Sequence, residues 1–389
     1  ISPTMHKYAV DRYTGISDFL QQHEIEASFY PQGSFRTGTV VRPIKDGTEG
    51  DYDIDVVCEL ISDKLTTSPA EVKNTVGSTL KSSEVYNEKL LPEQDRCWTL
   101  QYAEISNNIG LKLDVVPSVK EENSKILILK NKGVEDIYAQ HAIAITERIS
   151  DEKYRWGASN PKGYGDWFDA INKRFLLIGL RERKANFFKE NRSLFAAEAT
   201  IDEVPDFFIK SPLQRIIQLL KRHRDIYYGR IPGGNQLYPI SAIITTISAK
   251  IASEASMTDL ESLLTHIVSG FQEYSSLLQG KAPKQRFLGD ARNYIELKDQ
   301  KWWIPNPVNP DDNYADAWTD ETAQAFFNWI DVVSVDFVEP TVANETRYLA
   351  GLKTSFGSDF IEKVLQPVTT PQIITSPNII QPTKPWGMR

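Results

Sequence analysis

The chain has 389 residues, a formal net charge of -8 and a composition ordinary for a globular protein, with 41% apolar and 25% charged residues. This length suggests two or three domains, and no apolar run approaches the roughly 20 residues that cross a bilayer, so no membrane partner is expected. The acidic balance argues against a protein that coats nucleic acid through a broad basic face, although it leaves room for a local basic pocket that binds a small polyanion.

Two cysteines, Cys58 and Cys97, are too few for a disulfide framework. They favour a reducing compartment, which here means the cytoplasm. The five histidines show no zinc spacing with these cysteines, and the chain contains neither a GxxxxGK[ST] phosphate loop nor a GxSxG motif. The commonest nucleotide-binding and hydrolase sites are therefore excluded. Met5 is one candidate for the natural first residue.

Residues 1–160 mix helical and strand patterns. Apolar residues at helical spacing predict an amphipathic helix over 5–24, and a charged helix is expected over 69–90. Strands are predicted at 26–31, 52–60, 97–105, 109–119 and 125–133. The short polar link between the third and fourth of these predicts an antiparallel hairpin.

The pattern changes after residue 155. Residues 155–168 are rich in Gly, Pro and Trp and predict a connector. Helices are then predicted at 165–190, 211–228, 239–254, 257–279, 319–334, 340–353 and 357–366. Ser211 is the expected N-cap of the second of these, with Pro212 in its first turn and Gly229 just past its end. We therefore expect an α+β domain over 1–160, a helical domain over 161–366 and an extended tail over 367–389.

Three aspartates indicate the chemistry. Side chains two apart on a strand share a face, so Asp53 and Asp55 in GDYDIDVV project side by side, and a divalent cation would relieve their repulsion. Mg²⁺, with Mn²⁺ as the alternative, takes one or two carboxylates plus substrate phosphates. Asp114, in the apolar strand LKLDVV, is a candidate third ligand of a two-metal site. Alone, a DID pair is more often a solvated strand end, and Asp51 is interpreted as a turn residue.

Gly33 and Ser34 form a small-residue turn, and Gly33 lies 20 residues before Asp53. Gly33 permits close backbone approach, and Ser34 offers a hydroxyl and an N–H to a phosphate oxygen. A lone Gly-Ser pair is usually an ordinary turn, so its value here comes from the spacing to the aspartates.

The predicted helix 211–228 carries the basic run Lys221, Arg222, His223, Arg224, which spreads around the helix so that at most two of the four face one ligand. A solvated basic end near the helix C-terminus is the alternative. The stem of Lys221 lies near the apolar face, and its ammonium group reaches toward a cleft. Ser241 opens the next helix, either as a phosphate donor or as a plain cap.

These features together resemble polymerase-β-like nucleotidyltransferases, and more narrowly the bacterial cGAS/DncV-like nucleotidyltransferases (CD-NTases) of CBASS antiphage systems. The segments that carry the resemblance are QGSFRTGT (32–39), GDYDIDVV (50–57), LKLDVVPSV (111–119), SNPKGY (159–164) and PLQRIIQLLKRHRD (212–225). The resemblance reaches to about residue 250. It implies an α+β fold, with a nucleotidyltransferase core of mixed sheet and helices, a C-terminal helical domain and a cleft between the two lobes.

The resemblance also implies roles for single residues. It matches Gln32, Gly33 and Ser34 to the loop that grips the triphosphate. It matches Asp53, Asp55 and Asp114 to the catalytic, metal-binding carboxylates. It matches Lys221 and Ser241 to residues that contact the donor triphosphate from the helical lobe.

The implied activity is Mg²⁺-dependent synthesis of a cyclic di- or trinucleotide from ATP, GTP or other nucleoside triphosphates, with release of pyrophosphate, as a second messenger in antiphage defence. A linear product, as in oligoadenylate synthetases, or nucleotide addition to an RNA end is the alternative, and the three intact aspartates oppose an inactive scaffold. CBASS-encoded regulatory or conjugating proteins are the expected partners, the latter acting on the tail. The absence of a zinc-ribbon insertion argues against double-stranded DNA as an activator.

Overall fold

The computed structural model describes residues 3–45, 48–106, 109–195, 200–204, 206–281 and 294–339. All of these residues belong to one compact unit, and residues 340–389 lie outside the described part of the chain. The predicted helices at 340–353 and 357–366 and the predicted tail at 367–389 therefore lie outside it.

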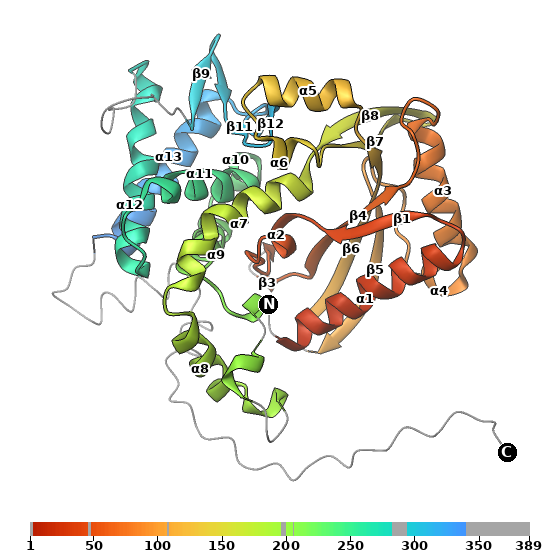
Figure 1. Cartoon of the computed structure of the whole chain (residues 1–389). Helices are drawn as coiled ribbons and strands as arrows, with labels where there is room; N and C mark the ends of the chain where they lie inside the picture. Colours follow the sequence, from red (N-terminus) through yellow and green to blue (C-terminus); the bar gives the residue numbers. More distant parts are fainter. Residues whose placement is uncertain are drawn as a thin grey trace. The chain divides into compact units, whose positions relative to one another are not determined.

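A six-stranded mixed sheet is the centre of the first half (Figure 1). Its strands are β1 (Ala27–Pro31), β4 (Tyr52–Leu60), β5 (Trp98–Ser106), β6 (Ile109–Lys120), β7 (Ile143–Ser150) and β8 (Lys153–Ser159). The order is β1-β4-β6-β7-β8, with β5 also paired to β6. Only the β4–β6 pairing is parallel within this sheet, and the predicted hairpin of β5 and β6 is confirmed as antiparallel. The sheet therefore brings β4 and β6, which carry the three aspartates, side by side.

Three helices pack on one face of this sheet: α1 (Pro3–Gln22), α3 (Pro69–Ser82) and α4 (Glu84–Asn87). Their apolar side chains share a core with the alternate residues of β4, including Ile54 and Val56. Because neighbouring strand residues point to opposite faces, this core directs Asp53 and Asp55 to the other face. The predicted helix 69–90 divides into α3 and α4 because Ser83 is extended and caps the second helix.

Two predictions for the first half are wrong. Residues 125–133, predicted as a strand, form helix α5 (Asn123–Asn131), which buries Ile126 and Leu129 and leaves Leu127 57% exposed. A short apolar run does not distinguish a strand from a helix by its period, and the three-residue spacing of the buried positions is helical. Residues 155–168, predicted as a connector, are the end of β8 and the start of α7 (Pro161–Leu177), where Asn160 caps the helix and Pro161 opens it.

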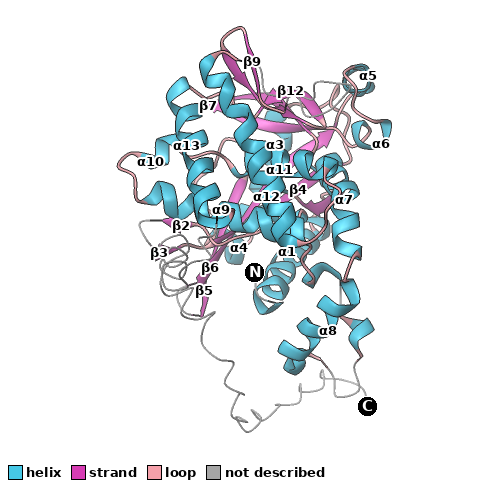
Figure 2. Ribbon diagram, turned by 90° about the vertical axis from the view of Figure 1, so that its left-hand side faces the viewer, coloured by secondary structure: helices cyan, strands magenta, loops and turns pink. Residues whose placement is uncertain are grey.

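The second half is mostly helical. After α7 come α8 (Leu180–Glu190), α9 (Pro212–Gly229), α10 (Gly234–Leu237), α11 (Ser241–Glu254), α12 (Leu260–Glu273) and α13 (Asp320–Phe337). Figure 2 shows α9, α11, α12 and α13 gathered together, and they share a hydrophobic core of their own. This is the α+β class predicted from the sequence, and the boundary at residue 160, where β8 gives way to α7, stays a prediction.

Ser211 is the N-cap of α9, as predicted. The Ser211 hydroxyl accepts from the Gln214 N–H, and the Gln214 side chain accepts from the Ser211 N–H, so the two residues form a capping box. The predicted helix 165–190 is broken between α7 and α8 by Gly179, whose φ is +67°. The predicted helix 257–279 is α12 followed by a 3₁₀ helix, Tyr274–Gln279.

Several small elements had no counterpart in the sequence prediction. They include the strand pairs β2 (Ile44–Lys45) with β3 (Thr48–Glu49), β9 (Glu296–Lys298) with β10 (Lys301–Trp303), and β11 (Pro305–Asn306) with β12 (Asn309–Asn313). The short helices α2 (Gly33–Arg36) and α6 (Asp136–Ala139) and 3₁₀ turns at Arg192–Leu194, Ile201–Glu203 and Asp206–Phe208 complete the described elements. Among the helices that the structure describes, none has the length and apolar composition of a membrane span.

The packing of Trp98 on α3 leads to a stability test. A Cβ atom added at Gly77 would lie 2.1 Å from the Trp98 ring, which is buried and donates its Nε1–H to the Lys73 carbonyl oxygen. Overpacking outweighs the helix propensity gained, so we expect Gly77→Ala to lower the free energy of unfolding by about 1–3 kcal/mol. The matched control is Gly229→Ala at the end of α9, where the added methyl group meets nothing within 4 Å. Equal urea midpoints for both variants and the wild type would refute this packing.

Candidate active site

The three predicted aspartates meet through the register of two strands. In the parallel pairing of β4 with β6, Asp55 is the direct partner of Asp114, and Asp53 precedes Asp55 by two residues on the same face. Burial, together with the charges of Asp114 and then Asp53, raises the pKa of Asp55 to about 7. The structure therefore brings the three carboxylates into one electrostatically coupled group.

This group fits a divalent cation that binds together with a substrate. The Thr99 hydroxyl, on β5, donates to Asp114 Oδ1 at 2.5 Å and fixes the orientation of that carboxylate. Among the described residues, no three Asp, Glu, His or Cys side chains converge on one point that a metal ion could occupy. Asp55 and Asp114 are direct partners in neighbouring strands, and they offer the one or two carboxylates that Mg²⁺ usually takes from a protein beside phosphate oxygens and water.

The Gly33–Ser34 turn lies directly against these carboxylates. The Gln32 N–H donates to the Asp55 carbonyl oxygen at 2.9 Å, and α2 begins at Gly33. Gly33 has a φ of +61°, and a Cβ atom there would lie 3.0 Å from Asp55 Oδ2. Both the backbone conformation and the contact with Asp55 require glycine at this position.

A cavity of about 610 Å³ joins this turn to the helical half. Seven of the eight predicted site residues line it: Gln32, Gly33, Ser34, Asp53, Asp55, Lys221 and Ser241. Asp114 is not among the lining residues and lies beside Asp55 in the neighbouring strand. Asp51, interpreted as a turn residue, precedes β4 and accepts from the Gly110 N–H at 3.0 Å, which ties the starts of β4 and β6 together.

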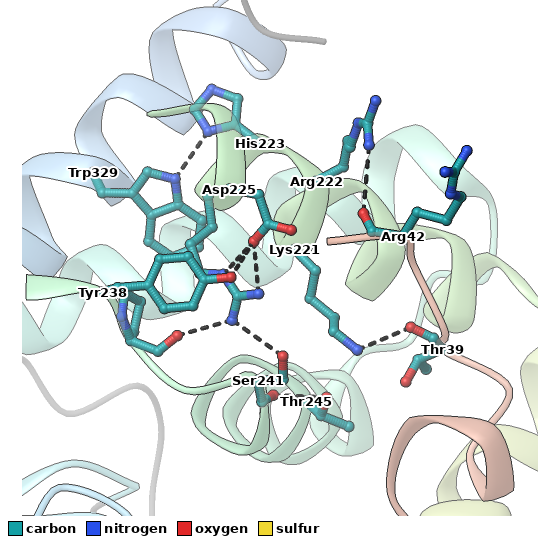
Figure 3. Close-up of polar contacts among 12 residues, drawn as sticks. Thr39, Arg42, Lys221, Arg222, His223, Asp225, Tyr238, Ser241, Thr245 and Trp329 are labelled. Carbon is teal, nitrogen blue, oxygen red and sulfur yellow. Dashed lines mark hydrogen bonds and ion pairs between the residues drawn. The ribbon is translucent and has the colours of Figure 1, made fainter. Parts of the chain in front are cut away.

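Lys221 is buried in the wall of this cavity. Its side chain belongs to a residue that is only 3% exposed, and its ammonium group donates to the Thr39 carbonyl oxygen at 2.9 Å (Figure 3). Burial, and then the neighbouring charge of Arg224, lower the pKa of Lys221 to about 7. Lys221 therefore titrates close to neutral pH in the absence of a bound anion.

The rest of the basic run does not form a solvated helix end, and that alternative is wrong. His223 is buried and turns toward α13, where its Nδ1 accepts from the Trp329 indole N–H and its Nε2 donates to Asp336. Arg224 is also buried and donates to the Ser241 hydroxyl oxygen at 3.1 Å. As the helical spacing predicts, two of the four, Lys221 and Arg224, line the cavity.

Sequence reasoning missed several cavity residues. Those with polar side chains are Thr37, Thr39, Ser159, Asn160, Tyr164, Asp225, Tyr238, Thr245, Asn306, Asp312 and Tyr314. Asn160 was within the segment predicted as a connector, and its capping position before Pro161 is a signal that could have placed it. Asn306 and Asp312 come from the short pair β11–β12, and no motif in the sequence marks them.

Comparison with known proteins gives three consistent results. The family model of the cyclic GMP-AMP synthase DncV-like nucleotidyltransferase domain matches residues 27–114, which include the Gly33–Ser34 turn and all three aspartates. A c-di-GMP synthase of Roseivirga ehrenbergii is 28% identical over 365 residues, covering 91% of this chain and 80% of that protein. The cyclic dinucleotide synthase CdnG of Bradyrhizobium diazoefficiens is 26% identical, covering 83% of this chain and 68% of that protein.

Solved structures agree with the fold. The structure of the B. diazoefficiens CD-NTase CdnG in complex with GTP superposes with a TM-score of 0.65 at 21% identity, covering 93% of this chain and 92% of that one. The E. coli CdnC:HORMA-deltaN complex gives a TM-score of 0.55 at 14% identity, covering 92% and 93%. The chain thus has the fold of the CD-NTases, and its residues 27–114 are similar to the DncV-like nucleotidyltransferase domain.

Proposed function

We propose that this protein is a nucleotidyltransferase that joins nucleoside triphosphates into a cyclic dinucleotide and releases pyrophosphate, with GTP among its substrates. The observation that carries this proposal is one cavity with the Gly33–Ser34 turn and the aspartates on one side and Lys221 and Ser241 on the other. The relatives named as c-di-GMP synthase and cyclic dinucleotide synthase support the product, and the GTP complex of CdnG supports the substrate.

The catalytic roles follow from the positions of the side chains. Asp53, Asp55 and Asp114 would hold Mg²⁺, or Mn²⁺ in its place, which when bound lowers the pKa of the attacking hydroxyl and offsets charge on the phosphates. From the helical side, Lys221 and Ser241 would bind the triphosphate. The cavity volume of about 610 Å³ lies within the usual range of small-ligand sites, and its walls orient the reacting groups.

The biological setting is part of the proposal. We infer that the product is a second messenger in CBASS antiphage defence and that a regulatory protein binds this chain, since CdnC has been solved with a HORMA protein. We also infer that the protein acts in the reducing environment of the cytoplasm, and its two free cysteines, Cys58 and Cys97, fit this location.

The reaction can be tested with labelled nucleoside triphosphates, Mg²⁺ and a phosphatase. We expect a phosphatase-resistant product of dinucleotide size when GTP is present, because a ring has no terminal phosphate. Asp53→Ala and Asp114→Asn should each lower the rate by at least about a hundredfold, because each removes a carboxylate that would hold a metal ion. A phosphatase-sensitive ladder would instead indicate a linear product, and equal product yield with Asp53→Ala would exclude this site.

The contact between Gly33 and Asp55 gives a second prediction. We expect Gly33→Ala to lower the rate of product formation by about ten- to a hundredfold, because the added methyl group displaces either the turn or the Asp55 carboxylate. Gly133→Ala is the matched control, since Gly133 also has a positive φ, +87°, but a Cβ atom there meets nothing within 4 Å. Similar melting temperatures with activity lowered in the first variant alone would support the argument, and equal activities would contradict it.

The pKa of Lys221 predicts linkage between nucleotide binding and proton uptake. A triphosphate beside Lys221 favours the charged form and raises its pKa above the value of about 7 that it has in the free protein. At pH 8, binding should therefore take up a fraction of a proton approaching one, and affinity should fall as pH rises from 7 toward the bound pKa.

Calorimetry of GTP binding in buffers of different ionisation enthalpy measures this uptake. Lys221→Arg serves as the control, because a guanidinium group stays charged throughout this pH range. An uptake at pH 8 that is the same in the wild type and in Lys221→Arg would show that Lys221 is not the group involved.

A further inference from the structure

Ser241 lies at the start of α11 and lines the nucleotide cavity, and its hydroxyl oxygen has a partner inside the protein. Arg224 Nη1 donates to Ser241 Oγ at 3.1 Å. A serine hydroxyl has one proton and two lone pairs, and a guanidinium group has donors only. The proton of the Ser241 hydroxyl therefore points away from Arg224.

Arg224 is held too firmly to serve as a ligand itself. Its Nε and Nη2 atoms donate to Asp225 Oδ1 at 2.9 and 2.7 Å, and its Nη1 also donates to the Pro239 carbonyl oxygen at 2.8 Å. The Tyr238 ring lies 4.0 Å from the guanidinium carbon, and its hydroxyl donates to the same Asp225 oxygen (Figure 3). The Arg224 side chain is only 4% exposed, so moving it toward a ligand would break several buried hydrogen bonds at once.

The charge of Arg224 is also balanced within the wall. The carboxylate of Asp225 forms an ion pair with it, and both residues are buried. Asp225 Oδ2 has no hydrogen-bond partner among the described residues. The carboxylate therefore accepts from Arg224 and Tyr238 through Oδ1 alone. The Arg224–Asp225 pair therefore adds little net positive charge to the cavity, and its main contribution is to orient the Ser241 hydroxyl.

We propose that Arg224 is a positioning residue, which fixes the Ser241 hydroxyl so that its proton is donated into the cavity, to a phosphate oxygen of the nucleotide. Asp225 and Tyr238 hold Arg224 in place for this purpose. The inference rests on the proposed function, because it takes the ligand of Ser241 to be a nucleoside triphosphate.

A double-mutant cycle on GTP affinity tests this. Ser241→Ala should weaken binding by about tenfold, the value of one hydrogen bond to a charged group, and Arg224→Lys by a similar factor because a lysine cannot keep the fork on Asp225 and also reach Ser241. The double variant should remain near tenfold weaker, since Arg224 acts through Ser241. A combined loss of about a hundredfold would show independent action and overturn the proposal.

Tyr238→Phe removes the hydroxyl that donates to Asp225 and retains the ring beside Arg224. We expect it to weaken GTP binding by about two- to threefold in the wild type and to have no effect in the Ser241→Ala background. A merely structural role would reduce affinity equally in both backgrounds.

Arg222→Lys is the matched control, because Arg222 donates to the Arg42 carbonyl oxygen and not to Ser241. Its effect on affinity should be the same with either residue at 241. If the wild-type chain binds no nucleoside triphosphate at all, the proposed function fails together with this inference. If it binds GTP and the cycle is multiplicative, only the inference fails.

Discussion

The parallel pairing of β4 with β6, in the register that sets Asp55 beside Asp114, is the constraint on which the site depends. Burial makes the Asp55 carboxylate costly to charge, and repulsion from the carboxylate of Asp114 in the neighbouring strand adds to this cost, so both raise the pKa of Asp55. Two neighbouring residues accommodate the paired carboxylates. Thr99 hydrogen-bonds one carboxylate, and glycine at position 33 leaves the space that the other needs. This pair of carboxylates is therefore suited to a cation that binds together with the substrate.

A second set of contacts joins the carboxylate side to the helical side. Gln214, Gln218 and Lys221 lie on one face of α9 and donate to the carbonyl oxygens of Thr37, Val40 and Thr39. The segment after α2 is thereby held by side chains of a helix far away in the sequence. Because buried donors must be satisfied, the Thr39 carbonyl oxygen accepts from Lys221 in this structure. In the proposed function, Lys221 would exchange this partner for a phosphate oxygen, which is a stronger acceptor.

The sequence predicted the local parts of this site better than their assembly. The strand 52–60 and the shared face of Asp53 and Asp55 follow from β-branched residues and a period of two, and both agree with the structure. Asp114 was grouped with Asp53 and Asp55 as a candidate metal ligand and through the family resemblance, but its register opposite Asp55 could not be predicted, because it depends on how β6 returns to lie parallel to β4. Likewise, the basic run on α9 includes Arg224 but does not predict its contact with Ser241, which is brought close only by the packing of α11 on α9.

The charges of the cavity connect these observations. Among the described residues that line it, the cationic side chains are Lys221 and Arg224, and Arg224 is neutralised by Asp225. Lys221 alone, with a pKa of about 7, cannot balance both a triphosphate and the carboxylates opposite it. Nucleotide and divalent cation should therefore each raise the affinity for the other, because thermodynamic coupling between two ligands is reciprocal. In the proposed function, this shortage of fixed positive charge means that the protein would contribute orientation, through Gly33, Thr99 and the Arg224–Ser241 contact. Neutralisation of the phosphates would be left to ions that arrive with the substrate.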